Sequence, residues 1–473
     1  MSSGMNAAGF EDGGFARWQA LVDKALKGAS ADSLVHQTDD GITLQPLYPT
    51  ASDPAIAMRG GDVPWTIAQR VDHPDPAKAH AQAMADLEGG ATGLMLACQG
   101  SPGAYGYGVL TDDLPVVLDG VLTDAIRLTL DPSPARARDA RALAAVLDAS
   151  APANTSIHVD FGLDPASILA GTGGLRGDEQ TALEAQGRHF HQLLAFGFGG
   201  TIFRADGRLV HNAGGTDAEE LGFILAGLAL AMRSIDDPAL AAERTLLMVS
   251  VDADQFAGIA KLRALRLLHA KLMEACDINA FAPRLHSETS LRMLTKRDPH
   301  VNMLRTTTAV FAAAVGGSDT VTTLPFTQAL GFPDGFARRT ARNTQLVLLE
   351  ESSLDQVNDP AAGSGLYEHY TETLCEKAWS AFQTIEAEGG VLRSLASGAI
   401  QARVKTSQEA RATEIAAGDR KLTGATVFQL ETEYPVEVED VAPVSYRLKE
   451  GLKLYADRLE LAPLEPSNTG EPA

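Results

Sequence analysis

Four histidines stand where they could take part in chemistry. His189 and His191 lie within a predicted helix, and His211 and His286 come at the ends of predicted strands. Histidines two residues apart point to different faces of a helix, so we do not expect His189 and His191 to share a metal ion. A histidine after a strand can polarise a carbonyl or transfer a proton, although a plain hydrogen-bonding role is commoner. His211 and His286 are therefore the two whose surroundings matter most.

Two glycine-rich segments could bring backbone N–H groups close to a ligand. Gly100–Gly108 lacks the G-x-G-x-x-G spacing and the downstream acidic residue of a dinucleotide site, which favours a long loop. Asp359–Gly365 is similar to the S-adenosylmethionine loop of adenine-type methyltransferases, but the Asn-Pro-Pro-aromatic motif of those enzymes does not follow. We interpret both segments as turns. Because G-x-S-x-G and H-E-x-x-H are also missing, short motifs alone indicate no reaction.

Composition narrows the classes of partner. Lys and Arg number 39 against 61 Asp and Glu, and the resulting net charge of −22 disfavours nucleic acid and anionic membrane surfaces. Three cysteines without a C-x-x-C pair predict neither a disulfide framework nor a zinc site. The longest apolar run, Leu221–Met232, is too short to cross a bilayer and is expected to be a buried helix capped by Thr216 and Glu219. A cytoplasmic protein is expected, because no signal peptide is recognisable.

From about Ala91 onward, short apolar runs alternate with helical-period stretches, which is typical of repeated β–α units. Eight strands are predicted, at Gly93–Cys98, Ala125–Asp131, Thr155–Asp160, Gly200–Arg204, Leu246–Asp252, Asn279–His286, Asp319–Pro325 and Asp355–Asp359. Helices are predicted at Asp75–Glu88, Arg136–Ala149, Glu179–Phe196, Asp217–Ile235, Ala253–Cys276, Pro299–Val315, Gly335–Glu351 and Gly365–Glu388. Eight such units close most economically into a (β/α)8 TIM barrel, with an open doubly wound sheet as the alternative.

Segments on both sides of the barrel complete the predicted organisation. Residues 1–62 form an amino-terminal arm, which is expected to pack on its own barrel or on another subunit. The arm contains an amphipathic helix with one apolar face, formed by Phe15, Trp18, Leu21, Val22 and Leu26. The barrel is assigned to residues 63–392. Residues 393–473 form a carboxy-terminal helical extension whose last part, Leu461–Ala473, is expected to be disordered.

Short blocks of sequence, in chain order, resemble the methylmalonyl-CoA mutase family. The blocks are Trp18–Gly28, Asp40–Ile42, Pro46–Tyr48, Pro64–Ile67 (P-W-T-I), His286–Ser290 (H-S-E-T-S against H-S-Q-T-S), Ala341–Leu346 (A-R-N-T-Q-L), Asp359–Ser364 and Glu376–Gly390. The resemblance implies a (β/α)8 barrel whose central channel takes a coenzyme A thioester. In the family this barrel is joined to a flavodoxin-like domain that holds adenosylcobalamin through a D-x-H-x-x-G histidine, and this sequence contains no such motif.

The sequence departs from the family at the positions that the family uses for catalysis. In catalytic chains P-W-T-I is followed by R-Q-Y, whose arginine contacts the substrate and whose tyrosine lies between substrate and corrin. Here those two places hold Ala68 and Arg70. The histidine that polarises the thioester carbonyl aligns with Leu209, with His211 two positions later, and Gly316–Thr323 lacks the histidines of the family's G-H-T-Q-S-L-H-T. The resemblance thus implies no catalytic residue and no metal site in this chain.

A residual substrate-binding set is carried over from the resemblance. It consists of Thr66 together with Arg284, His286 and Ser287 at the end of the sixth predicted strand. The overall pattern is similar to the small, beta-type subunit of heterodimeric mutases, which isomerise methylmalonyl-CoA and succinyl-CoA. This implies a large catalytic partner subunit that binds the adenosylcobalamin of the complex.

Two alternatives stay open at this point. In the first, the chain is a substrate-binding subunit that works with a separate cobalamin protein, and Arg70 and His211 replace the missing groups. In the second, the chain is a regulatory barrel that binds acyl-CoA without an enzyme partner.

Overall fold

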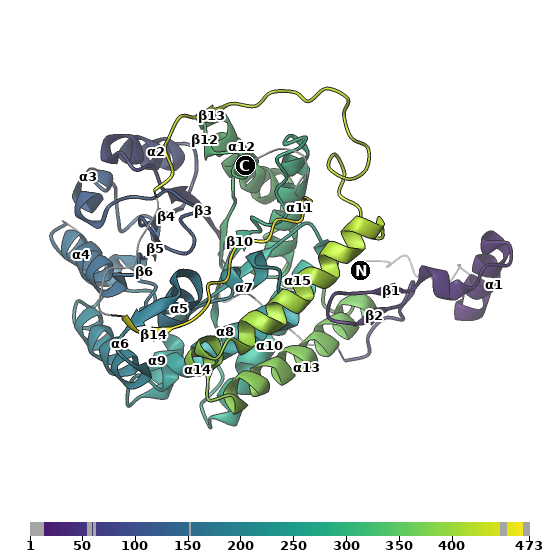
Figure 1. Cartoon of the computed structure of the whole chain (residues 1–473), viewed down its shortest axis with the longest axis horizontal. Coiled ribbons are helices and arrows are strands. Elements are labelled where there is room, and N and C mark those ends of the chain that lie inside the picture. The colour runs from purple at the N-terminus through teal and green to yellow at the C-terminus, as the bar shows by residue number, and fades with distance from the viewer. Residues whose placement is uncertain (1–13, 54–58, 60–62, 151–152, 445–451, 467–473) are drawn as a thin grey trace, which may run out of the picture.

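A computed structural model describes residues 14–53, 59, 63–150, 153–444 and 452–466 of the chain. Within these residues, parallel strands form one eight-stranded sheet in the order β6-β5-β4-β3-β11-β10-β9-β8. The strands are β3 (Thr66–Val71), β4 (Gly93–Ala97), β5 (Arg127–Asp131), β6 (His158–Asp160), β8 (Phe203–Asp206), β9 (Thr245–Val251), β10 (Arg284–Thr289) and β11 (Thr320–Thr322). The edge segments beside β6 and β8 also meet, because Val159 N donates to Gly199 O at 3.0 Å and Phe161 N to Thr201 O at 3.0 Å. The sheet therefore closes into the predicted (β/α)8 barrel (Figure 1).

Helices surround this barrel. They are α2 (Pro76–Glu88), α3 (Leu114–Val117), α4 (Arg136–Asp148), α5 (Pro165–Thr172), α6 (Glu179–Leu194), α7 (Arg208–Asn212), α8 (Asp217–Met232), α9 (Pro238–Glu243), α10 (Gln255–Ala275), α11 (Val301–Val315), α12 (Gly335–Leu346) and α13 (Gly365–Ala387). Short turns of other helix types are η1 (Ala31–Leu34), η2 (Thr111–Asp113), η3 (Asn154–Ser156) and the π-helical η4 (Val347–Glu351). None of the described helices is both long and apolar enough to cross a bilayer.

Helix α8 is the apolar run that the sequence predicts to be buried, and it begins with the predicted capping box of Thr216 and Glu219. It packs between the barrel and α13, so nearly all of its residues are buried. The closest approach is at Gly222, where an added Cβ would lie 2.8 Å from the Cβ of Ala381. An apolar surface all round the helix is therefore required by its place between two layers.

One predicted strand is wrong, and one strand of the barrel was not predicted. Asp355–Asp359 forms turns, and Asp359 has a left-handed backbone with φ of 47°. The first strand of the barrel is instead β3, which was missed because polar Gln69 and Arg70 interrupt its apolar pattern. Each of the other predicted strands therefore comes one place later in the order of barrel strands than predicted, and β10 is the seventh strand.

The amino-terminal arm has two parts. Its hairpin, β1 (His36–Gln37) and β2 (Thr43–Leu44), docks on the barrel, since Ile42 is buried and Asp40 accepts a hydrogen bond from Ala218 N at 3.2 Å. Helix α1 (Gly14–Leu26) has no buried residue among those described and stands away from the barrel in Figure 1. The expected packing of this helix on its own barrel is therefore wrong, and packing on another subunit stays a prediction.

The carboxy-terminal part continues through α14 (Val391–Ala396) and α15 (Ala399–Ala417). It then adds two short antiparallel strands, with β13 (Val438–Glu439) pairing β12 (Phe332–Pro333) and β14 (Leu452–Tyr455) pairing β7 (Gly174–Arg176). The domain boundaries at residues 62 and 392 stay predictions.

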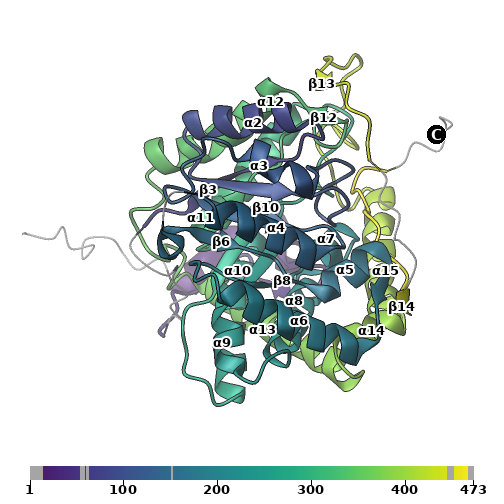
Figure 2. The same ribbon diagram turned by 90° about the vertical axis from the view of Figure 1, so that its left-hand side faces the viewer.

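Residues 456–466, here called the mouth strap, cross the end of the barrel at which the strands terminate. Four of their backbone N–H groups bond to it: Ala456 to Gly173 O at 3.1 Å, Leu459 to Ala170 O at 2.8 Å, Ala462 to Asn212 O at 2.8 Å and Leu464 to Arg292 O at 2.9 Å. Figures 1 and 2 show the strap running from β14 over this face. Disorder is thus a wrong prediction for residues 461–466, and residues 467–473 lie outside the described part. Backbone hydrogen bonds hold this segment in place. Such bonds cannot be predicted from the polarity of the side chains.

Candidate functional site in the barrel lumen

Charged side chains fill the lumen at the carboxyl ends of the strands. We call this group the lumen network, and its members are Arg70, Asp72, Asp131, Arg204, Asp206, Arg208 and Glu288, all buried. They reach the lumen because alternate residues of a barrel strand point inward, while the residues between them pack under the helices. The strands β3, β5, β8 and β10, with the first residue of α7, supply them.

Two arginines hold Glu288 from opposite sides. Arg70 Nη1 and Arg208 Nη1 lie 3.0 and 3.1 Å from Glu288 Oε2. Tyr105 donates its hydroxyl to Glu288 Oε1 at 2.5 Å, and its ring lies 5.0 Å from the Arg70 guanidinium carbon. Arg70 is further bound to Asp72 at 3.1 Å and to Gly103 O at 2.6 Å. Each of the three guanidinium nitrogens of Arg70 therefore donates a hydrogen bond within the chain.

The other half of the network neutralises two aspartates. Arg204 Nη2 and Arg208 Nη2 lie 2.9 and 3.3 Å from Asp131 Oδ1, and Arg208 Nη2 lies 2.7 Å from Asp206 Oδ2. Burial alone would raise the pKa of Asp131, but the charges of Arg208 and Arg204 lower it to about 2. The network thus pairs its charges within the chain, with Arg338 as a further partner of Asp72, and a ligand entering it would have to break ion pairs that are already desolvated.

The predicted substrate-binding residues are not brought together. Thr66 and Arg284 lie at the amino ends of β3 and β10, so the expectation that Arg284 ends its strand is wrong. His286 is buried in mid-strand, with Nε2 2.8 Å from Thr322 Oγ1. Ser287 points to the other face, where its hydroxyl bonds to that of Ser318. A binding role for these four residues stays a prediction.

Burial, and then the charge of Arg208, lower the pKa of His286 to about 3. The native state therefore keeps this imidazole neutral, whereas the unfolded chain protonates it below about pH 6.5. Stability from this group is present above pH 6.5 and is lost as the pH falls towards 3. Between pH 6.5 and 5, we expect wild type to lose more stability than His286→Gln, by roughly 1–2 kcal/mol, measured by denaturant unfolding. His191→Gln, at an exposed position, is the control, and equal losses in the His286 variant and wild type would contradict the expectation.

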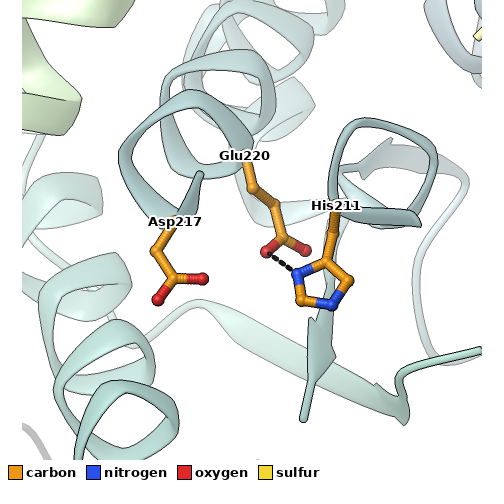
Figure 3. Close-up of side chains that lie close together, drawn as sticks. All are labelled: His211, Asp217 and Glu220. Carbon is orange, nitrogen blue, oxygen red and sulfur yellow. Dashed lines mark ion pairs between the residues drawn. The ribbon is translucent and has the colours of Figure 1, made fainter. Parts of the chain in front are cut away.

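His211 does not face the lumen. It lies in α7, with Nε2 2.8 Å from Ser290 Oγ and Nδ1 3.4 Å from Glu220 Oε2 (Figure 3). His211, Asp217 and Glu220 include ligand types that a divalent metal prefers, and they lie close together. However, Lys261 Nζ sits 2.8 Å from both Asp217 Oδ1 and Glu220 Oε2. An ammonium group thus already occupies the cation position, and the cluster has the character of a buried ion pair.

Leu209, at the family's histidine position, lines a small cavity of about 130 Å³ beneath the mouth strap. Leu459 and Leu461 of the strap close this cavity, whose inner wall includes Arg208 and Tyr105 of the lumen. The strap is also held at its end, since Glu465 accepts hydrogen bonds from Lys296 N at 2.6 Å and Arg297 N at 3.1 Å. The strap therefore covers part of the barrel mouth, and a larger cavity of about 1450 Å³ lies beside it, lined by Tyr105, Arg411 of α15 and Leu464 of the strap.

Comparisons with known proteins agree with one another. The family model described as methylmalonyl-CoA mutase matches residues 202–459. The methylmalonyl-CoA mutase small subunit of Streptomyces virginiae is 37% identical over 461 residues, covering 92% of this chain and 73% of that protein. The chain belongs to the methylmalonyl-CoA mutase family. Within it, the chain is of the small-subunit type, as the further relatives also indicate.

Those further relatives have similar coverage. A probable methylmalonyl-CoA mutase small subunit of Mycobacterium bovis is 35% identical, over 89% of this chain and 70% of that protein. The small subunit of Propionibacterium freudenreichii subsp. shermanii is 32% identical, over 88% and 68% respectively. Among solved structures, a dihydrodipicolinate synthase from Agrobacterium tumefaciens superposes with a TM-score of 0.32 at 11% identity, over 73% of this chain and 97% of that one. That likeness is too distant to bear on function.

Membership of the mutase family makes adenosylcobalamin the group to test against this barrel. The mouth strap lies across part of the strand ends and bonds to Asn212 and Arg292, and charged side chains fill the lumen beneath it. Beneath the strap, Arg70 stands where the family's catalytic chains have tyrosine, and it is bound to Glu288. Arg70 and His211, the two residues considered as replacements for the missing groups, are both bound within the chain, to Glu288 and Ser290.

Sequence reasoning identified Arg70 as a departure from the mutase family but missed its partners. Glu288 was seen only as a change within H-S-Q-T-S, and Asp131, Arg204 and Asp206 were not singled out. The sequence does contain a pattern that predicts these charges. Apolar and charged residues alternate in Phe203–Asp206, a strand that helices cover from outside. Charges at alternate positions of such a strand must point into the lumen and find opposite charges there.

Proposed function

We propose that this chain is the non-catalytic small subunit of a heterodimeric methylmalonyl-CoA mutase, acting in the cytoplasm. The observation that supports the proposal most is the pairing of Arg70 with Glu288 and of Glu288 with Arg208. In this proposal a large partner subunit binds adenosylcobalamin and isomerises methylmalonyl-CoA and succinyl-CoA. The small subunit stabilises that partner through a subunit interface.

The chemistry of the reaction explains why a filled lumen matters. Adenosylcobalamin supplies radical chemistry when it is bound, and such chemistry needs a dry channel in which the substrate alone meets the radical. A substrate thioester also needs a hydrogen-bond donor at its carbonyl, and the side chain of Leu209 cannot donate one. Together with the filled lumen, this favours a structural role for the barrel over a substrate-binding role.

The amino-terminal helix supports the proposed partner. Phe15 and Leu21 of α1 are 65% and 60% exposed, and they belong to the apolar face that the sequence predicts. Exposed apolar side chains on one helix face are typical of surfaces that pack on another protein. The docked hairpin fixes where this helix leaves the barrel, because Asp39 pairs with Arg411 at 2.6 Å. We therefore assign α1 to the interface with the large subunit.

Affinity purification from cells at native expression tests this proposal. We expect one larger chain to co-purify in equimolar amount, and the complex to show the absorption spectrum of a cobalamin. The chain purified without that partner is expected to show no cobalamin absorption after incubation with adenosylcobalamin and gel filtration. Isolation of the chain free of any larger partner, or cobalamin retained by the chain alone, would contradict the proposal.

A further inference from the structure

A second pocket lies on the rim of the barrel, outside the lumen. It has a volume of about 630 Å³ and is formed by the amino end of α4, the facing side of α6, strand β7 and the loops after β4 and β5. Figure 2 shows α4 and α6 beside each other on this flank of the barrel. The volume is within the range of small-molecule sites.

Arginines dominate the polar lining of this rim pocket. Arg136, Arg138, Arg141 and Arg176 all line it. This is notable in a chain whose net charge is −22, because random placement of charges would favour acidic walls. The cluster comes from two separate segments, the first two turns of α4 and the end of β7.

Carboxylates of the lining, Asp112 and Asp139, balance only two of these four positive charges. Arg138 pairs with Asp112 at 2.7 Å. The other carboxylate of the lining, Asp139, is occupied by Ser133, whose N and Oγ donate to it at 2.8 and 2.5 Å. Within the described part of the chain, the three remaining arginines, Arg136, Arg141 and Arg176, have no carboxylate at ion-pair distance. The pocket therefore carries an excess of positive charge.

The surroundings add to this preference for an anion. Helix α4 starts at this pocket, and its cap residue, Ala135, offers no side-chain hydrogen bond to the free N–H groups of the first turn. The positive end of the helix dipole thus points at the pocket. His189 bonds to Arg141 at 3.0 Å, and burial together with the charges of Arg141 and Arg136 lowers its pKa.

We propose that the rim pocket binds a small molecule that carries a phosphate or diphosphate group. Arginine guanidinium groups bind phosphate oxygens in pairs of parallel hydrogen bonds, and several arginines around one space match the several oxygens of such a group. The remainder of the ligand packs on Leu110, Ile168 and Leu175, which form the apolar part of the lining. This site is separate from the lumen and does not depend on the function proposed above.

Isothermal titration of the full chain with adenosine diphosphate and with inorganic pyrophosphate tests this inference. We expect saturable binding of at least one probe below about 1 mM, weakened by added salt. Tighter binding of adenosine diphosphate supports a nucleotide-like ligand that uses the apolar wall. Equal or tighter binding of pyrophosphate supports recognition of the phosphate groups alone. No binding of either probe at 10 mM, as roughly the limit of a specific site, would overturn the proposal.

Variants of the pocket arginines test whether the probe binds in the rim pocket. Arg141 and Arg176 are exposed, so the double variant Arg141→Ala/Arg176→Ala is expected to fold like wild type. It should bind the probe at least about 30-fold more weakly, because each charge-assisted bond lost costs about 10-fold or more. Arg188→Ala, at an exposed arginine outside the pocket lining, is the matched control and should bind normally. Unchanged affinity in the double variant would place the binding elsewhere and overturn the proposal.

Discussion

Replacing Glu288 with Gln is expected to lower the free energy of unfolding by about 3–5 kcal/mol. Gln keeps the shape of the side chain but removes the charge that Arg70 and Arg208 share. Two buried guanidinium groups then lose an anionic partner in surroundings without water to replace it. Denaturant unfolding of the purified chain measures the effect, and the midpoint is expected to fall without a change in slope.

Two further variants show whether the loss comes from the lumen network. Asp112→Asn breaks an exposed ion pair with Arg138 and should leave stability nearly unchanged. The double variant Arg70→Met/Glu288→Leu replaces both charges by apolar groups and should recover part of the loss. If the Glu288→Gln variant is as stable as the Asp112→Asn variant, the ion pairs of the lumen network do not stabilise the fold as expected.

Placing acidic residues on the apolar face of α1 is expected to weaken the proposed subunit complex strongly. Phe15→Asp/Leu21→Asp should reduce affinity for the large subunit by about 100-fold or more, because apolar anchors at an interface each contribute about 2 kcal/mol or more. The fold of the chain itself should be unaffected, since neither side chain is buried in it. Sedimentation of the purified subunits at several concentrations measures the affinity.

The matched control places the same charges on the opposite face of the same helix. Ala16→Asp/Ala20→Asp adds two negative charges at exposed positions away from Phe15 and Leu21. This control should bind the large subunit within a few fold of wild type. Equal weakening by both double variants would mean that charge, rather than the apolar face, causes the effect. No weakening by either would remove α1 from the interface.

Much of the fold could be predicted from periodicity, because hydrophobic spacing and capping are local properties of the chain. The eight predicted helices all exist, and most begin within two residues of the predicted position. Strand β3 could not be recognised in this way, since a strand buried on both faces can carry Arg70 when that face points into a charged lumen. The turn at Asp355–Asp359 was the compensating error, which kept the strand count at eight.

The site could be predicted only in part, because its contacts join distant segments. Arg70 and Glu288 are separated by 218 positions, and no local pattern relates them. The resemblance to the mutase family marked Arg70 and Leu209 as departures, but it could not show that Arg70 has a partner of opposite charge. The mouth strap was missed for a similar reason, since its backbone bonds to Ala170, Asn212 and Arg292 join it to three separate segments, namely α5, α7 and the loop after β10.

Turnover measured with and without the partner tests the central claim most directly. The purified chain, with adenosylcobalamin and methylmalonyl-CoA, is expected to form no succinyl-CoA above the rate of a blank without protein. The complex with the co-purified large subunit is expected to isomerise the substrate, and Tyr105→Phe in the small subunit should leave that rate unchanged. Succinyl-CoA formation by the chain alone would contradict the account.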